Sequence, residues 1–281
     1  MTENIVSTDW LSRHLGSPDI AIIDASWHLP SAGRDPRAEF RAARIPGAQF
    51  FDIDEICDTA SPYPHMLPSP EKFSSRMRKL GIGDGKRVIA YDAAGLFSAA
   101  RAWWMFRVFG HDDVAVLDGG LPKWQAEGHP LDDGPVLKPQ ERHFTARYQS
   151  MMVRDMSEVA QALRTGAAQV ADARSPSRFR GEEAEPRAGV RAGHMPGARN
   201  VHYATLLKPD GTLRPADEIA GVFAAAGIDV SKPVITSCGS GITAAILTLG
   251  LTLAGRRDHA VYDGSWTEWG STPDRPVATG P

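Results

Sequence analysis

The chain has 281 residues, a formal net charge of −3 and a sequence pI near 6.3. This length suits two domains of ordinary size, each able to bury a core. The balanced charge gives no electrostatic argument for nucleic acid or a membrane surface, and we expect neither as a partner.

The two cysteines, Cys57 and Cys238, are too few for a disulfide framework and fit no structural zinc pattern. We therefore expect a reduced, cytoplasmic setting. We also expect no metal and no organic cofactor, because the two histidines nearest the motifs have no partners at ligand spacing. The first ten residues are polar and acidic, so no signal peptide is expected. The sequence has no window of about 20 apolar residues, so no helix that spans a bilayer is predicted.

The chain repeats itself. Four segments of the first half have counterparts in the second half, in the same order and 145 to 150 residues further on: Ile22–Ser26 with Val170–Arg174, Ala43–Ala48 with Gly193–Ala198, Val88–Asp92 with Val234–Cys238, and Val116–Gly120 with Val261–Ser265. This pattern predicts one domain occurring twice, not a short-period solenoid. We place the N-terminal domain at 1–135, a linker at 136–153 and the C-terminal domain at 154–281.

Within each half, short apolar runs alternate with helical patterns. The first half has helical patterns over 70–80 and 99–109, and the second half has them over 156–165 and 217–226. This alternation predicts an α/β fold in which a mainly parallel sheet is flanked by helices. Because ligands bind beyond the carboxyl ends of strands in such sheets, the loops that follow the strands are the candidate sites.

The most informative of these loops begins with Cys238. It follows the apolar run Pro233–Ser237 and precedes the helical run Ala244–Leu251, so a strand, a tight loop and a helix start are predicted. A thiol there faces unpaired backbone amides and the positive end of a helix dipole, which favour the thiolate and make the cysteine nucleophilic. The alternative is a buried cysteine that packs as a small hydrophobe. Asp92 holds the same place in the first half, which therefore lacks the thiol chemistry and serves as scaffold.

The duplication, the Asp-Ala-Arg and His-Met-Pro-Gly-Ala segments and the cysteine loop together resemble the rhodanese-type sulfurtransferases, over nearly the whole chain. The fold implied is two tandem rhodanese-like domains. Within this family the loop Cys-Gly-Ser-Gly-Ile-Thr-Ala is similar to that of the 3-mercaptopyruvate enzymes, with Ile242 in place of valine. Thiosulfate-specific members carry arginine and lysine where this chain has Gly239 and Ser240, so the loop disfavours a dianionic donor.

The resemblance implies a two-step reaction through Cys238. The thiolate would take sulfur from 3-mercaptopyruvate, release pyruvate and become a persulfide, which then passes sulfur to cyanide, a thiol or thioredoxin. The loop residues Gly239, Gly241, Ile242 and Thr243 would bind substrate and stabilise the sulfur anions through their amides.

Two arginines, Arg178 and Arg187, match the family's pair, nine residues apart. A planar guanidinium suits a carboxylate, and two of them can grip the carboxylate and the keto oxygen of the donor. Composition alone does not choose them, because Arg174, Arg180 and Arg191 lie in the same stretch.

The resemblance also implies a relay of Ser240, His65 and Asp54. The departing pyruvate needs a proton, histidine titrates near neutrality, and an aspartate can fix its tautomer. The alternative is that His65 is a structural hydrogen-bonding group and that Asp54 caps a turn.

Other activities stay open or are excluded by the same loop. A thiosulfate:cyanide sulfurtransferase and a non-enzymatic persulfide carrier are the alternatives. A phosphatase of the related Cdc25 type needs a loop one residue longer that ends in arginine, whereas Ala244 follows Thr243 here; we reject that activity.

Overall fold

The computed structural model describes residues 3–281, which form two compact units. Of the described residues, the first unit comprises 3–58, Leu67–Gln149 and Pro209–Thr212, and the second comprises Thr59–Met66, Ser150–Lys208 and Leu213–Pro281. Two short segments thus group with the unit formed by the other half of the chain. One of them carries His65. The proposed domain bounds of 1–135 and 154–281 remain a prediction.

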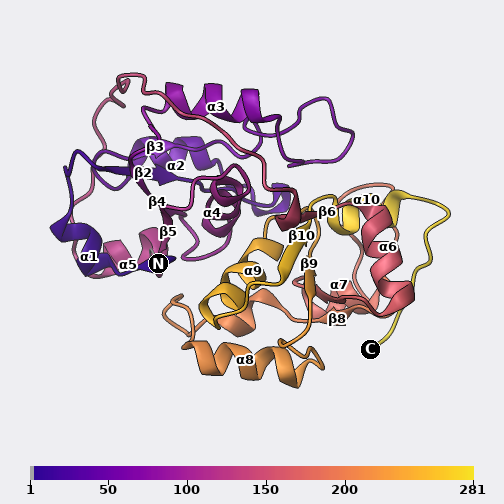
Figure 1. Ribbon diagram of the computed structural model, residues 1–281. Helices are drawn as coiled ribbons and strands as arrows, with labels where there is room; N and C mark the ends of the chain where they lie inside the picture. The colour runs from indigo at the N-terminus through magenta and orange to yellow at the C-terminus, as the bar shows by residue number, and fades with distance from the viewer. Residues whose placement is uncertain (1–2) are drawn as a thin grey trace. The chain divides into compact units, whose positions relative to one another are not determined.

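The first unit is built on a five-stranded sheet in the order β1-β5-β4-β2-β3, with every neighbouring pair parallel (Figure 1). Its strands are β1 (Ile5–Val6), β2 (Ile20–Asp24), β3 (Gln49–Phe50), β4 (Arg87–Tyr91) and β5 (Val114–Leu117). Its helices are α1 (Thr8–Arg13), η1 (Pro30–Ala32), α2 (Pro36–Ala42), α3 (Pro70–Lys79), α4 (Ala99–Val108) and α5 (Gly120–Ala126).

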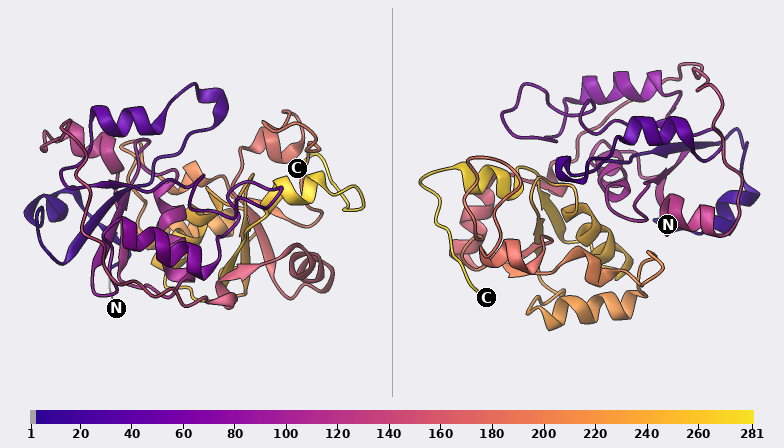
Figure 2. Two further views of the ribbon diagram at one scale, coloured as in Figure 1. Left: turned by 90° about the horizontal axis from the view of Figure 1, so that it is seen from above. Right: turned by 180° about the vertical axis from the view of Figure 1, so that it is seen from behind.

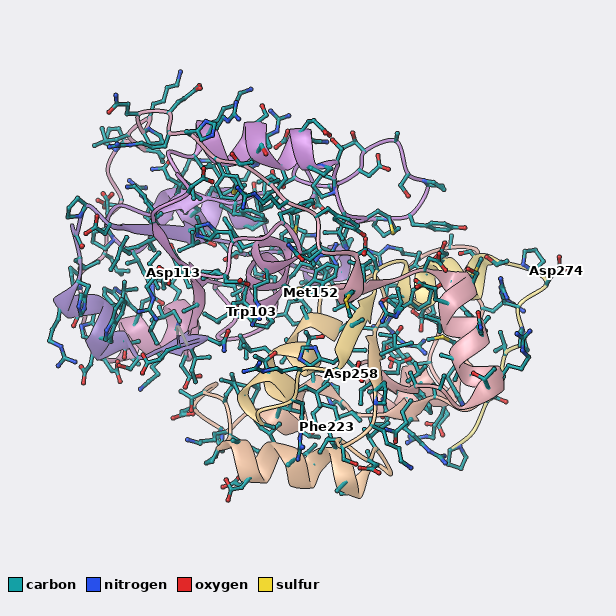
Figure 3. The ribbon with its side chains drawn as sticks, in the orientation of Figure 1. Trp103, Asp113, Met152, Phe223, Asp258 and Asp274 are labelled. Atoms are coloured by element: carbon teal, nitrogen blue, oxygen red, sulfur yellow. The ribbon has the colours of Figure 1, made fainter. Side chains whose placement is uncertain are left out.

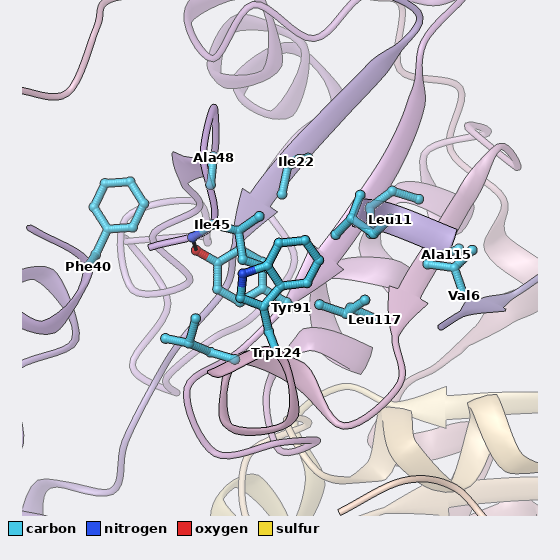
Figure 4. Packing of buried hydrophobic residues seen from close by; sticks show 12 residues of the cluster. Val6, Leu11, Ile22, Phe40, Ile45, Ala48, Tyr91, Ala115, Leu117 and Trp124 are labelled. Atoms are coloured by element: carbon cyan, nitrogen blue, oxygen red, sulfur yellow. Dashed lines mark hydrogen bonds between the residues drawn. The ribbon is translucent and has the colours of Figure 1, made fainter. Parts of the chain in front are cut away.

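Helices cover both faces of this sheet. On one face, side chains of α1, α2 and α5 pack with the sheet in a buried cluster around Tyr91 and Trp124, and the Tyr91 hydroxyl accepts a hydrogen bond from the Ile45 amide (Figure 4). On the other, Phe73 of α3 stacks on Phe109 and meets Phe106 of α4 edge-on. A strand buried on both faces must be apolar throughout, which explains the run Val88–Tyr91.

The second unit repeats this architecture in the order β6-β10-β9-β7-β8, again all parallel. Its strands are β6 (Val153–Arg154), β7 (Gln169–Asp172), β8 (Arg199–Asn200), β9 (Val234–Ser237) and β10 (His259–Tyr262). Its helices are η2 (Ser150–Met152), α6 (Met156–Thr165), α7 (Pro176–Arg180), η3 (Tyr203–Leu206), α8 (Ala216–Ala225), α9 (Ala244–Leu253) and α10 (Ser265–Ser271). The identical strand order confirms the duplication and the α/β fold class.

Helices α6, α7 and α10 share one buried cluster with the second sheet, and α8 packs beside α9 (Figure 2). Phe223 of α8 is fully buried, and its label in Figure 3 lies between these two helices. Helix α9 is apolar on all sides and buried over most of its length, which is expected of a helix covered on every face. It begins where the candidate cysteine loop ends.

The segment from Leu131 to Gln149 has no helix or strand, whereas the last four residues of the predicted linker form η2 and the start of β6. It is nevertheless fastened to the first unit. Arg78 donates to the carbonyl of Phe144, and the Gln149 amide donates to the carbonyl of Val108. Among the described residues, no helix is long and apolar enough to cross a membrane.

Candidate active site

The cysteine loop lies at the carboxyl edge of the second sheet. Strand β9 ends at Ser237, helix α9 begins at Ala244, and Cys238 to Thr243 connect them. Strand β9 pairs with β7 on one side and β10 on the other, so the loop is flanked by the ends of both. The predicted strand, loop and helix start are confirmed. Cys238 itself is 2% exposed, and Gly241 has φ +78°, a left-handed conformation that glycine adopts without strain.

The first two residues of the loop are held by the start of α10. The Cys238 amide donates to Ser265 Oγ at 3.2 Å, and the Cys238 carbonyl accepts from the Trp266 amide at 2.9 Å. The Gly239 carbonyl accepts from the amide of Thr267 at 2.8 Å and also from its hydroxyl. These bonds fix the backbone on which the sulfur is mounted.

Ser265 is an unusual part of this support. It is fully buried and has φ +50°, a region that non-glycine residues rarely occupy. Its hydroxyl also donates to the Tyr262 carbonyl at 2.8 Å. The counterpart of Ser265 in the first unit is Gly120, with φ +54°, where an added Cβ would lie 2.6 Å from two carbonyl oxygens. Sequence reasoning missed Ser265, although its pairing with Gly120 in the repeat was the available signal.

The rest of the loop presents amides. In the described range 3–281, the amides of Ser240, Ile242 and Thr243 have no protein acceptor. Such amides beside a helix N-terminus form a site for a negative charge. Of the predicted loop residues, this assigns a donor group to Ile242 and Thr243.

The first unit shows what the equivalent loop does with an anion. Asp92 occupies the place of the cysteine, and its Oδ2 accepts hydrogen bonds from the amides of Phe97, Ser98 and Ala99, each at 2.8 Å. Its Oδ1 accepts from the Ala94 amide at 2.9 Å. One copy of the loop therefore holds a carboxylate with four amides between Ala94 and Ala99, which supports anion binding by the equivalent loop of the second unit.

Arg178 lies against the cysteine loop. It comes from α7, the helix that follows β7, and its side chain is 15% exposed. A Cβ added to Gly239 would lie 3.0 Å from Arg178 Nη2, so the guanidinium occupies the space that a larger residue at 239 would need. The structure thus brings together the predicted site residues Arg178, Gly239 and Cys238.

The other cations of this stretch have different tasks. Arg174 is buried, pairs with Asp172 at 2.7 Å, and stacks 4.6 Å above the Trp266 ring. Arg180 pairs with Glu182 at the surface, and Arg191 donates to backbone carbonyls, among them Thr272 at 2.6 Å. Composition did not show which arginines of this stretch bind the donor, and these contacts assign Arg174, Arg180 and Arg191 to other partners. Arg187 is half-buried in the loop between α7 and β8.

Glu185 is a second residue that sequence reasoning did not single out. Its carboxylate, 3% exposed, binds Arg174 Nη1 at 2.7 Å and Arg178 Nη2 at 2.5 Å. The signal was its place beside Pro186 and Arg187, where an acidic residue accompanies the predicted arginine pair.

His65 and Ser240 meet in the second unit. His65 is buried, has φ +63°, and its Nδ1 lies 3.0 Å from Ser240 Oγ and 3.3 Å from the Ser240 carbonyl oxygen. A protonated Nδ1 can donate to either oxygen, whereas a bare Nδ1 can only accept from the hydroxyl. Asp54 belongs to the first unit, where its carboxylate accepts from the Trp27 indole at 3.1 Å. The first two members of the predicted relay are adjacent.

The second cysteine has a contrasting environment. Cys57 lies in the first unit, its thiol donates to the Asp54 carbonyl at 3.0 Å, and burial raises its pKa. Among the described residues, no group of three or more histidines, cysteines and carboxylates could hold a metal ion.

The fold and site define a class of protein: two tandem α/β domains, of which the second carries a cysteine in an amide-lined loop. The chain matches the rhodanese-like domain model twice, over residues 7–127 and 155–272, and it belongs to the rhodanese family.

Similar proteins include the "3-mercaptopyruvate sulfurtransferase" of Escherichia coli K12, 44% identical over 97% of this chain and 96% of that protein. The mitochondrial "Thiosulfate/3-mercaptopyruvate sulfurtransferase 1" of Arabidopsis thaliana is 41% identical over 98% of this chain and 78% of its own length. The crystal structure of the E. coli 3-mercaptopyruvate enzyme SseA superposes with a TM-score of 0.86 and 42% identity, covering 94% of this chain and 99% of that one.

Proposed function

We propose that this chain is a sulfurtransferase that moves the sulfur of 3-mercaptopyruvate to a thiophilic acceptor through a persulfide on Cys238. The observation that carries the proposal is the position of Cys238 in an amide-lined loop with the Arg178 guanidinium against it. A nucleophile, an anion site and a carboxylate-binding cation thus converge on one loop. Relatives named as 3-mercaptopyruvate sulfurtransferases over almost the full chain support the donor.

In the first step the Cys238 thiolate attacks the donor sulfur, forming an S–S bond while the C–S bond of the donor breaks. The electron pair of that bond leaves with carbon as the enolate of pyruvate, which takes up a proton. Loop amides stabilise the sulfur anion before and after attack. In the second step cyanide, a thiol or thioredoxin attacks the outer sulfur and Cys238 leaves as thiolate. The reaction written in this way needs no cofactor.

Arg178 and Arg187 would bind the carboxylate and the keto oxygen of the donor. A guanidinium presents paired N–H donors that match a carboxylate, so it orients the sulfur as well as binding it. Ser240 would pass a proton to the departing carbon, with His65 replacing it. Asp54 is the predicted third member of this relay.

The cysteine loop argues against thiosulfate as the donor, whereas the name of one relative argues for it. Gly239 and Ser240 supply no positive charge for thiosulfate, whereas the Arabidopsis relative is named for both donors. Thiosulfate:cyanide transfer is therefore the second candidate activity, and a persulfide carrier without donor turnover is the third.

The deciding experiment measures pyruvate formation from 3-mercaptopyruvate and thiocyanate formation from thiosulfate. It compares the wild-type chain with Cys238→Ser and with Cys57→Ser as the matched control. We expect preference for 3-mercaptopyruvate, loss of activity only in Cys238→Ser, and a mass increase of one sulfur on the peptide containing Cys238. A preference for thiosulfate would overturn the donor assignment, and a persulfide without turnover of either donor would favour the carrier.

The cytoplasmic setting and thioredoxin as acceptor belong to the same proposal. The two cysteines are free and buried, as suits a reducing compartment, although one relative is named mitochondrial. Cell fractionation tests the compartment. Measuring pyruvate release with reduced thioredoxin as the sole acceptor tests the partner.

A further inference from the structure

We propose that Glu185 is a positioning residue for donor binding, which it serves by holding the Arg178 guanidinium against the cysteine loop. The inference rests on the proposed function. It concerns a carboxylate that touches neither Cys238 nor the loop, and that acts through the arginine.

The geometry places Glu185 in the middle of a row of alternating charges. Asp172, at the end of β7, binds Arg174; Arg174 and Arg178 both bind Glu185. The side chains of Asp172, Arg174 and Glu185 are between 0% and 3% exposed, whereas Arg178 is 15% exposed. The row is therefore anchored in the interior at one end and reaches the loop at the other.

Anchoring matters because an arginine side chain is long and flexible. Left alone on a five-residue helix, Arg178 would sample many rotamers, and fixing it would have a cost in entropy at each binding event. Glu185 Oε2 lies 2.5 Å from Arg178 Nη2, the nitrogen that also faces Gly239. The guanidinium is thus preorganised where the donor carboxylate would need it.

Glu185 also restrains the loop that carries Arg187. Ala184 and Pro186 on either side are exposed, so the buried carboxylate fastens a surface segment. Proline at 186 limits the backbone between the fastened residue and Arg187. The fastened residue therefore lies two positions before Arg187, while the same carboxylate binds Arg178 directly.

Glu185→Gln preserves shape and removes the charge. Arg174 keeps Asp172, the carbonyl of Gly193 and the Trp266 ring as partners, so we expect the variant to fold. The matched control is Glu182→Gln, which removes the surface partner of Arg180 on the same helix. We expect the KM for 3-mercaptopyruvate to rise about tenfold or more in Glu185→Gln with kcat changed less than about twofold. Glu182→Gln should match wild type.

A second readout does not depend on the donor. In a Cys57→Ser background, alkylation of Cys238 by iodoacetate and by iodoacetamide compares an anionic with a neutral reagent of nearly the same size. Through-space electrostatics alone predicts that removing a negative charge raises the iodoacetate to iodoacetamide rate ratio. Positioning predicts the opposite sign. We expect the ratio to fall in Glu185→Gln, to fall in Arg178→Gln, and to fall no further in the double variant.

An unchanged or raised ratio in Glu185→Gln would overturn the inference, as would additive losses in the double variant. Failure of the wild-type chain to convert 3-mercaptopyruvate would instead refute the proposed function, and the alkylation ratio would still decide the role of Glu185.

Discussion

Ser265 offers a substitution whose effect can be worked out in parts. Its hydroxyl makes two buried hydrogen bonds, from the Cys238 amide and to the Tyr262 carbonyl. Ser265→Ala leaves both backbone groups unpaired and keeps the left-handed conformation, so the free energy of unfolding should fall by about 2–3 kcal/mol. Ser265→Gly loses the same bonds but adopts φ +50° without strain, which returns about 1 kcal/mol. The glycine variant should therefore be the more stable of the two.

The first unit supplies the reverse substitution as a control. Gly120→Ser would place a Cβ 2.6 Å from the carbonyl oxygens of Asp92 and Gly95, so we expect a loss of about 3 kcal/mol or more. Urea unfolding monitored by circular dichroism measures the free energy of unfolding of all three variants. The comparison holds where the m values, the slopes of that free energy against urea concentration, are equal. Two results would refute this account of the support beneath Cys238. One is a Ser265→Ala variant within about 0.5 kcal/mol of wild type, and the other is a Ser265→Gly variant that is less stable than Ser265→Ala.

Three further outcomes are expected. Asp92→Ala removes the acceptor of four amides, so thermal unfolding should begin at a lower temperature and the free energy of unfolding should fall by about 2–4 kcal/mol; an unchanged melting curve would contradict the anion role. His65→Gln should slow pyruvate release about tenfold or more while leaving sulfur transfer from preloaded persulfide to cyanide unchanged, and equal slowing of both steps would argue against a proton relay. Burial raises the pKa of Asp24 from 3.8 to about 6, so its contribution to stability is present below pH 3.8 and is lost as the pH rises through 6. The wild type should therefore lose about 1.4 kcal/mol from this group between pH 5 and 8, and Asp24→Asn should remove that part of the profile in urea titrations at both pH values.

The duplication made most of the fold predictable. Once Val88–Asp92 is paired with Val234–Cys238, the central strand and its loop are located in both units, and helical periodicity locates α3, α4, α6 and α8 to within about one residue. The resemblance predicted that His65 meets Ser240, but periodicity alone could not group residues 59–66 with the second unit, because a short irregular segment has no pattern that records its long-range contacts.

The site was predictable where a residue's chemistry is specific, and less so where its role is support. Cys238 and Arg178 carry reactive or charged groups in a recognisable pattern, and they do lie together. Ser265 and Glu185 act through hydrogen bonds and ion pairs to residues far away in the chain, and only three-dimensional proximity shows those partners. The usual preference of glutamate for the surface would have placed the Glu185 side chain in solvent, whereas it is buried.

Because Asp92 stands where the second unit has Cys238, the charge beside the corresponding helix start is constant in the first unit and would change during turnover in the second. The amides at the start of α4 are satisfied by a charge that belongs to the chain itself, so that half meets the same electrostatic load at every stage of a reaction cycle. In the proposed reaction, the amides at the start of α9 would instead stabilise a sulfur that gains and gives away an atom. The rate of amide hydrogen exchange at the N-terminus of α9 should therefore differ between the free and the sulfur-loaded forms. The rate at the N-terminus of α4 should be the same in both forms.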